Sequence, residues 1–321
     1  MKIVYTDWVQ PDLELEERIL AAAGMALGAA EPQCQTAADV IRVAEDAEAL
    51  IVLYAPITHE VFAALPHLRI ISLPLVGVDA VDLEAAREHG VWVAYVPDAC
   101  VPEVGVHAVA MALALVRHLP FYDRAVREGR WDYEEPGVLR RPTHLTFGLL
   151  GCGRIARQAG ASAAPSFGRV LAYDPYVPAE NWPDGIERAP NIETLFRDSD
   201  VISLHAPIVA ETRHIVDTAL LARMKPGSYL VNAARGGLVD PGALLNALDS
   251  GQLAGAALDV FEPEPPDMND PLLHHARVMV TPHAAYYSVE GDEEGRGRAI
   301  HNIIDFARCG RPNDFVVAGT K

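Results

Sequence analysis

Short runs rich in β-branched and aliphatic residues alternate with helical patterns along nearly the whole chain. This alternation predicts repeated strand–helix units, and therefore an α/β fold built on parallel sheets. At roughly 150 residues per domain, the 321 residues correspond to about two domains, each large enough to bury its own core.

The pattern divides the chain into two series of strands. The first hundred residues predict one open sheet, with strands at 2–6, 49–53, 69–73 and 91–93 and helices near 13–23, 36–44 and 83–89. An apolar helix is expected over about 102–119, followed by an irregular connection over 124–143. Six further strands fit a Rossmann dinucleotide-binding sheet: 145–150, 170–173, 201–205, 229–233, 256–260 and 277–281. A last helix, about 288–308, is expected to return to the first domain, which would then comprise 1–100 and 287–321 around a second domain at 101–286.

The net charge of the chain limits the kinds of partner that it can bind. The chain has 44 Asp and Glu against 26 Lys and Arg, a net charge of −18, which repels nucleic-acid phosphates and anionic lipid. We therefore expect neither nucleic acid nor membrane as a partner. The four cysteines are widely spaced with no C-x-x-C pair, and the N-terminal segment has no signal-peptide pattern. Free thiols, a cytoplasmic location and no metal site are the expectations.

A glycine-rich segment predicts the cofactor. In TFGLLGCGRIA, Gly151, Gly153 and Ala156 form a G-x-G-x-x-A pattern between a predicted strand and a predicted helix. The glycines allow a tight turn and a close approach to a pyrophosphate, which the helix N-terminus attracts. Asp174 ends the next strand, where a carboxylate can bind ribose hydroxyls and repel a 2′-phosphate. No arginine follows in DPYVPAE, so NAD is favoured over NADP. The alternative is that the glycines serve only a turn and Asp174 only caps a loop.

Three polar residues follow the later strands. Arg235 lies in NAARGGLVD, Glu264 in ALDVFEPEP and His283 in TPHAAYYS. The carboxyl ends of parallel strands meet at one edge of a sheet, so these side chains are expected to converge. A guanidinium binds carboxylate or carbonyl oxygens, and a histidine paired with a glutamate can donate a proton to an alkoxide forming beside a hydride donor. Taken singly, each residue could instead be structural.

Together these segments resemble the D-isomer-specific 2-hydroxyacid dehydrogenase family, as do the LHAP segment at 204–207 and GRPNDFV near the C-terminus. TDWVQPDLELEERIL, VPDACVPEV and TPHAAYYS are most similar to the branch of the C-terminal-binding proteins and the phosphoglycerate dehydrogenases. The resemblance covers essentially the whole chain. It implies a flavodoxin-like substrate domain with a Rossmann domain, and a homodimer formed largely through the cofactor domain. It also implies NAD-dependent hydride transfer between nicotinamide and a (R)-2-hydroxy acid or 2-oxo acid pair.

The resemblance also implies residue roles. Arg235 would orient the substrate carboxylate and polarise the keto group. His283 would be the general acid in reduction and the base in oxidation, with Glu264, rather than the nearby Glu262, holding its ring. Asp259 would receive the nicotinamide carboxamide. Further cofactor contacts would come from Arg154, Ile155, His205 and Ala233, and further substrate contacts from Val76, Gly77 and Tyr286.

The chain departs from this branch before the Val76–Gly77 cradle. Leu73 stands where an arginine is usual, Leu75 where a glycine is usual, and Val106 replaces an acidic residue of the apolar helix. A missing cation and a more apolar wall favour a hydrophobic or unusual 2-oxo acid. The alternative from another class is an NAD(H)-binding, corepressor-like scaffold with little turnover. His107 is expected to be a structural residue of the apolar helix, and Trp131 to line the pocket or lie in the core.

Overall fold

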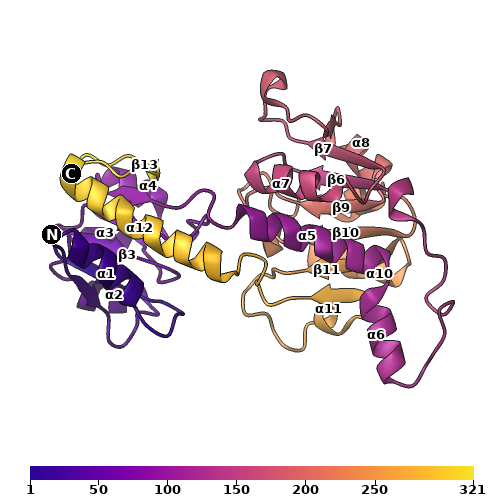
Figure 1. Ribbon diagram of the computed structural model, residues 1–321, viewed down its shortest axis with the longest axis horizontal. Coiled ribbons are helices and arrows are strands. Elements are labelled where there is room, and N and C mark those ends of the chain that lie inside the picture. Colours follow the sequence, from indigo (N-terminus) through magenta and orange to yellow (C-terminus); the bar gives the residue numbers. More distant parts are fainter. The chain divides into compact units, whose positions relative to one another are not determined.

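The computed structural model describes all 321 residues, which form two compact units (Figure 1). Unit 1 comprises Met1–Cys100 and Tyr287–Lys321, and unit 2 comprises Val101–Tyr286. These boundaries coincide with those expected for the two domains. Unit 1 is therefore assembled from both ends of the chain, with unit 2 inserted between them.

Unit 1 is built on a six-stranded sheet in the order β13-β5-β4-β3-β1-β2. All neighbours pair in parallel except β13, which is antiparallel to β5. The parallel part, β2-β1-β3-β4-β5, has the flavodoxin-like order, with a switch point between β1 and β3. The strands are β1 (Ile3–Tyr5), β2 (Leu27–Ala29), β3 (Ala49–Ile51), β4 (Ile70–Ser72), β5 (Trp92–Ala94) and β13 (Phe315–Val317).

Helices cover both faces of this sheet because successive strand residues point to opposite sides. Val4 and Leu50 belong to the core under α2 (Ala37–Val43), α3 (His59–Ala64) and α4 (Leu83–Glu88). Their neighbours Ile3, Tyr5 and Ile51 belong to the core under α1 (Glu14–Ala22) and α12 (Val289–Cys309). Both faces are buried, which explains why these strands read as nearly continuous apolar runs.

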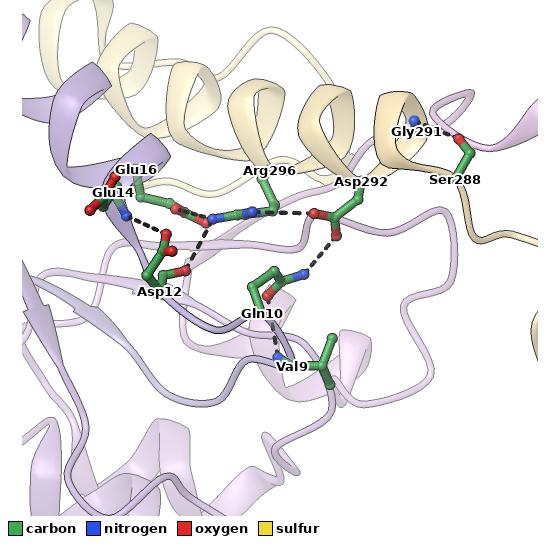
Figure 2. Close-up of polar contacts among 9 residues, drawn as sticks. All are labelled: Val9, Gln10, Asp12, Glu14, Glu16, Ser288, Gly291, Asp292 and Arg296. Atoms are coloured by element: carbon green, nitrogen blue, oxygen red, sulfur yellow. Dashed lines mark hydrogen bonds and ion pairs between the residues drawn. The ribbon is translucent and has the colours of Figure 1, made fainter.

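A buried ion pair joins α1 to α12 (Figure 2). Arg296 Nε and Nη2 each lie 2.7 Å from the Glu16 carboxylate, and Arg296 Nη1 lies 3.2 Å from Asp292. Gln10 extends the network by donating to Asp292 at 2.6 Å. The side chains of Glu16 and Arg296 are only 1% and 10% exposed. This network attaches the C-terminal helix to the first helix of the chain, as the sequence predicted for the last helix.

Unit 2 is built on a seven-stranded sheet in the order β12-β11-β10-β9-β6-β7-β8, with every pair parallel. Counted within the unit, this is the Rossmann order 3-2-1-4-5-6 with one further strand, and its switch point lies between β6 and β9. The strands are β6 (Thr146–Leu150), β7 (Arg169–Tyr173), β8 (Glu187–Arg188), β9 (Val201–Leu204), β10 (Ser228–Asn232), β11 (Leu253–Leu258) and β12 (Val278–Val280).

The helices of unit 2 also cover two faces (Figure 1). One core cluster holds residues of α8 (Ile192–Asp198), α9 (Thr218–Leu221) and α10 (Pro241–Asp249). On the other side, α5 (Val101–Val116) packs against α7 (Arg154–Ala163), β10 and β11. The remaining helices are α6 (Leu119–Arg127) and α11 (Pro271–His274). No single helix has the length and apolarity to span a membrane; only the α5–α6 pair meets those criteria together, and it is bent by 59°.

The structure corrects the expected elements in several places. The predicted helix over 102–119 and the irregular stretch over 124–143 were wrong in detail, because α5 ends at Val116 and α6 continues to Arg127. His118 adopts a left-handed φ of 53°, and Pro120 near the start of α6 favours a new helix there. The elements β2, β8, β13 and α3 were not predicted. Trp131 is 89% exposed, so it is not a core residue.

Candidate active site

The glycine turn lies at the switch point of the unit 2 sheet. Gly151 follows β6 with a φ of +102°, and a Cβ there would lie 2.8 Å from the carbonyl oxygen of His205. Gly153 is the N-cap of α7, and no side chain caps that helix. A Cβ at Gly153 would meet no atom within 4 Å, so open space lies in front of the helix N-terminus. Ala156 is buried, as the motif requires. The chain therefore leaves room for an anion beside the first N–H groups of α7.

Asp174 lies beside this turn. Its Oδ2 accepts a hydrogen bond from Cys152 N at 2.9 Å, and its Oδ1 accepts one from Tyr176 N at 2.8 Å. A basic neighbour of this loop was not predicted, because it belongs to the unpredicted β8. Arg188 donates to the carbonyl oxygens of Asp174 and Val177, at 3.3 and 3.0 Å. The guanidinium is held there by stacking on the Trp182 ring at 4.5 Å.

His205 ends the neighbouring strand and is a neutral group near pH 7. Its Nε2 lies 2.9 Å from Ser203 Oγ, and burial lowers the pKa of the ring from 6.5 to about 4. The unfolded chain therefore binds one more proton than the folded chain between these two values. This difference makes folding less favourable as the pH falls from about 6.5 towards 4.

We expect replacement of His205 by glutamine to reduce this acid sensitivity. Between pH 7.5 and pH 5, the wild-type chain should lose about 1–2 kcal/mol more unfolding free energy than His205→Gln, after allowance for solvent screening. Urea unfolding at the two pH values measures the difference. An equal loss in both proteins would contradict the burial of this imidazole as the cause.

The three polar residues singled out above converge. Arg235, Glu264 and His283 follow β10, β11 and β12, which are neighbours in the sheet. His283 Nδ1 lies 2.5 Å from Glu264 Oε2, while Glu264 Oε1 accepts a hydrogen bond from Phe261 N at 2.9 Å. Burial of the Glu264 carboxyl opposes its ionisation, but the hydrogen bonds from His283 and Phe261 and the charges of His283 and Arg235 hold its pKa below the ordinary value. Glu264 is therefore a carboxylate at neutral pH.

Two glycines bring the loops of this cluster together. A Cβ at Gly236 would lie 2.2 Å from the Phe261 carbonyl carbon, and one at Gly237 would lie 2.7 Å from Glu262 Oε2. At Gly236, where the contact is with backbone, only a residue without a side chain permits this approach between the loops after β10 and β11. Glu262, the competing carboxylate, pairs with Arg213 through two contacts of 2.9 Å. The two acids of EPEP thus have separate partners.

His283 occupies a turn with a left-handed φ of 50°. Its backbone N donates to the carbonyl of Asp259 at 2.7 Å. The Asp259 side chain is 1% exposed, and both of its oxygens accept hydrogen bonds from residues 281–285. The carboxylate thus accepts three hydrogen bonds within the chain, and its contact with a nicotinamide carboxamide stays a prediction. The Tyr286 ring meets the His283 ring edge-on at 5.9 Å.

The remaining candidates are placed as follows. Arg154 and Ile155 form the first turn of α7, and Ala233 follows β10 in a buried position. Val76 and Gly77 belong to unit 1, half-buried in the loop after β4. None of the His, Cys, Asp and Glu side chains forms a group of three or more that could hold a metal ion.

Leu73 does not form the apolar wall that we expected. It is 0% exposed and packs in the unit 1 core beneath α2, α3 and α4. That interpretation was wrong because the Leu73 side chain, three residues before Val76, points into the core. Two exposed side chains at the unit 1 switch point were also not predicted as candidates: Val9 and Tyr54 are 66% and 54% exposed. Asp7 fixes this loop by accepting hydrogen bonds from the backbone N–H groups of residues 53–55, at 3.2, 2.6 and 3.1 Å.

Known proteins share this combination of folds and residues. The family described as "D-isomer specific 2-hydroxyacid dehydrogenase, NAD binding domain" matches residues 109–285. A glyoxylate reductase of Korarchaeum cryptofilum is 38% identical over 284 residues, which cover 86% of this chain and 85% of the relative. A D-3-phosphoglycerate dehydrogenase of Archaeoglobus fulgidus is 37% identical over 249 residues, but these cover only 47% of that longer protein and 77% of this chain. The structure of D-lactate dehydrogenase from Aquifex aeolicus, complexed with NAD and lactic acid, superimposes with a TM-score of 0.89, at 28% identity, over 99% of this chain and 100% of that one.

The chain therefore belongs to the D-isomer-specific 2-hydroxyacid dehydrogenase family. Within this family it is an NAD-dependent oxidoreductase that interconverts 2-hydroxy and 2-oxo acids. The relatives support this function, and not the corepressor-like scaffold considered as an alternative. They also favour the phosphoglycerate-dehydrogenase side of the resemblance.

Proposed function

We propose that this enzyme uses Arg235, Glu264 and His283 to transfer a hydride between NADH and a 2-oxo acid with an uncharged side chain. The observation that carries this proposal is the 2.5 Å contact between His283 Nδ1 and Glu264, with the Arg235 charge acting on the same carboxylate. Glu264 and His283 follow adjacent strands at the carboxyl edge of the Rossmann sheet, where ligands of such folds bind.

The glycine turn fits NAD. The open space before Gly153 and the uncapped N-terminus of α7 support binding of a pyrophosphate by the N–H groups of Arg154 and Ile155. Asp174 would accept hydrogen bonds from the adenosine ribose, and the Ala233 carbonyl and His205 would line the same cofactor site. When bound, NADH supplies the hydride from C4 of its nicotinamide ring.

The side chains account for the rest of the chemistry. His283 directs Nδ1 at Glu264, which leaves Nε2 to hold the proton that the reduced keto oxygen needs. The Glu264 carboxylate favours the imidazolium form before transfer and fixes the ring orientation. In unit 2, Arg235 would bind the substrate carboxylate and polarise the keto group, and Tyr286 would line the pocket. In unit 1, the backbone N–H groups of Val76 and Gly77 are proposed as donors to a carboxylate.

The substrate side chain is proposed to be uncharged. Val9 and Tyr54 offer apolar surface at the unit 1 switch point, where ligands of flavodoxin-like sheets bind. These exposed apolar side chains support an uncharged substrate side chain rather than a second carboxylate or a phosphate. They replace Leu73 as the basis for this substrate class.

The experiment is NADH oxidation at saturating NADH against 2-oxo acids graded by size and charge, run beside a His283→Ala enzyme. We expect 4-methyl-2-oxopentanoate to exceed oxaloacetate and phosphohydroxypyruvate in kcat/KM. Glyoxylate or oxaloacetate as the best substrate would defeat the substrate class. No turnover with any acid, despite tight NADH binding, would defeat the proposed reaction.

We expect alanine at the two glycines of the turn to give opposite results. Gly151→Ala places a side chain at a left-handed backbone 2.8 Å from a carbonyl oxygen, so it should lower the unfolding free energy by roughly 1–3 kcal/mol. Gly153→Ala enters open space at an ordinary φ, so it should leave stability within about 0.5 kcal/mol yet fill the space proposed for the pyrophosphate. Urea unfolding and NADH fluorescence titration measure both effects. Unchanged NADH affinity in Gly153→Ala would contradict the cofactor site.

We also propose that two copies associate through unit 2. The segment over 119–138 carries apolar and aromatic side chains in the open, which are Leu119, Val126, Trp131, Tyr133 and Val138. Exposed apolar surfaces of this kind commonly bind another protein. A second copy of the chain could cover this surface with its own identical surface, related by two-fold symmetry. Light scattering after size exclusion tests this: the wild type should have the mass of a dimer and Trp131→Ser with Val138→Ser that of a monomer.

We further propose a cytoplasmic location. The four cysteines are free thiols, which supports a reducing compartment. Cell fractionation with a cytoplasmic marker tests it.

A further inference from the structure

The turn that carries His283 depends on one buried carboxylate. Asp259 Oδ1 accepts hydrogen bonds from Thr281 Oγ1 at 2.5 Å and from Ala284 N at 2.8 Å, and its Oδ2 accepts one from Ala285 N at 3.0 Å. These partners flank the left-handed residue His283 on both sides. Any change that weakens this carboxylate as an acceptor should therefore loosen the imidazole that pairs with Glu264.

His107 of α5 is the basic side chain that lies against this carboxylate. Its Nε2 is 3.3 Å from Thr281 Oγ1 and 3.9 Å from Asp259 Oδ1. The Thr281 hydroxyl donates its single proton to Asp259, so towards His107 it acts as an acceptor. His107 Nε2 consequently carries a proton. An N–H donor in this position offsets part of the cost of burying the Asp259 charge.

The helix that bears His107 is fixed against the cofactor helix. A Cβ at Gly105 would lie 2.6 Å from Gln158 Cγ and 3.1 Å from Ala159 N, so α5 and α7 pack in near-backbone contact two residues from His107. Helix α5 also packs on β10 and β11, the strands that lead to Arg235 and Asp259. His107 thus has a rigid support on the side away from the turn.

We propose that His107 is a positioning residue for the reaction, which acts through Thr281 and Asp259 to hold the His283 turn. This inference rests on the function proposed above and adds to it. His107 does not touch the reacting atoms; it supplies the N–H that completes the hydrogen-bond chain from α5 to His283. Its loss should leave substrate and cofactor bound but the proton donor poorly placed.

The first test measures the turn itself, without turnover. Hydrogen–deuterium exchange of a peptide covering 281–286 reports the amides of His283, Ala284 and Ala285. We expect His107→Leu to raise their exchange rates about tenfold, the effect of losing one hydrogen bond of ordinary strength. His107→Gln retains an N–H donor of similar reach and should change the rates less than about twofold. His144→Leu, an exposed histidine of the same unit, is the matched control and should match the wild type.

The second test separates positioning from binding. In His107→Leu, we expect kcat for 2-oxo acid reduction to fall about tenfold, while the KM for the acid and the Kd for NADH change less than about twofold. His107→Gln should restore most of kcat. Unchanged exchange in His107→Leu, equal losses in the leucine and glutamine variants, or a change confined to KM would each overturn the proposal. If the wild type reduces none of the acids, the proposed function fails, and the exchange experiment still decides whether His107 holds the turn.

Discussion

Replacement of His283 by alanine should lower kcat for reduction of the best 2-oxo acid by about 10²–10⁴-fold. The variant removes the group that pairs with Glu264 at 2.5 Å and is proposed to hold the transferred proton at Nε2. Hydride transfer alone would then create an alkoxide with no proton donor beside it. Stopped-flow measurement of NADH oxidation at saturating substrate gives the size of the loss.

The control is His274→Ala, which removes a histidine of α11 that bonds the Met268 carbonyl. It should retain kcat within about twofold, because it lies outside the proposed site. NADH affinity should stay unchanged in both variants. If His283→Ala kept more than a third of the wild-type kcat, a different proton donor would have to be sought.

Replacement of Glu16 by alanine should lower the unfolding free energy of unit 1 by about 3–5 kcal/mol. The change leaves the Arg296 guanidinium without its bidentate partner in a position only 10% exposed. Asp292 at 3.2 Å remains as a carboxylate partner, but a buried charge that loses its main partner costs far more than the loss of an exposed ion pair. Hydrogen exchange of the β1 amides measures the loss in unit 1.

Two further variants test whether the buried charge causes this loss of unfolding free energy. Glu17→Ala, an exposed neighbour on the same helix, should change stability by less than about 0.5 kcal/mol. The double variant Glu16→Leu with Arg296→Met should recover much of the loss, because it removes the guanidinium together with its main partner and fills the space. A double variant as unstable as Glu16→Ala would show that packing around α1 and α12, rather than charge, dominates.

The sequence predicted the central strands of both sheets well because these strands are buried on both faces, as β1, β3, β4, β6 and β9 are. Such strands read as apolar runs, and motif residues follow directly after them, as Gly151 does. The strand β8 was missed because it has only two residues, Glu187 and Arg188, which are charged and exposed at the sheet edge and give no apolar pattern. Arg188 and its place beside the Asp174 loop were missed with it.

The burial of individual side chains and the hydrogen bonds between distant residues also could not be predicted from the sequence. The resemblance to the family indicated where Leu73 lies in the chain but not which way its side chain points. The side chain lies in the core. The helical pattern correctly placed His107 on α5, yet its neighbour Thr281 is 174 residues away in the chain. Contacts over such separations leave no periodic signal, so neither the Asp259 network nor the Arg296 network could be inferred from spacing.

The split of unit 1 between the two ends of the chain affects the order in which the protein can form during synthesis. At about 5–20 residues per second, a ribosome completes all of unit 2 before it makes α12. Until residues 289–309 emerge, the sheet face that holds Ile3, Tyr5 and Ile51 is covered by α1 but not by α12. Glu16 meanwhile lacks Arg296, which lies 280 residues downstream. The nascent chain therefore carries a finished cofactor domain while its other half still exposes apolar surface of the kind that chaperones bind.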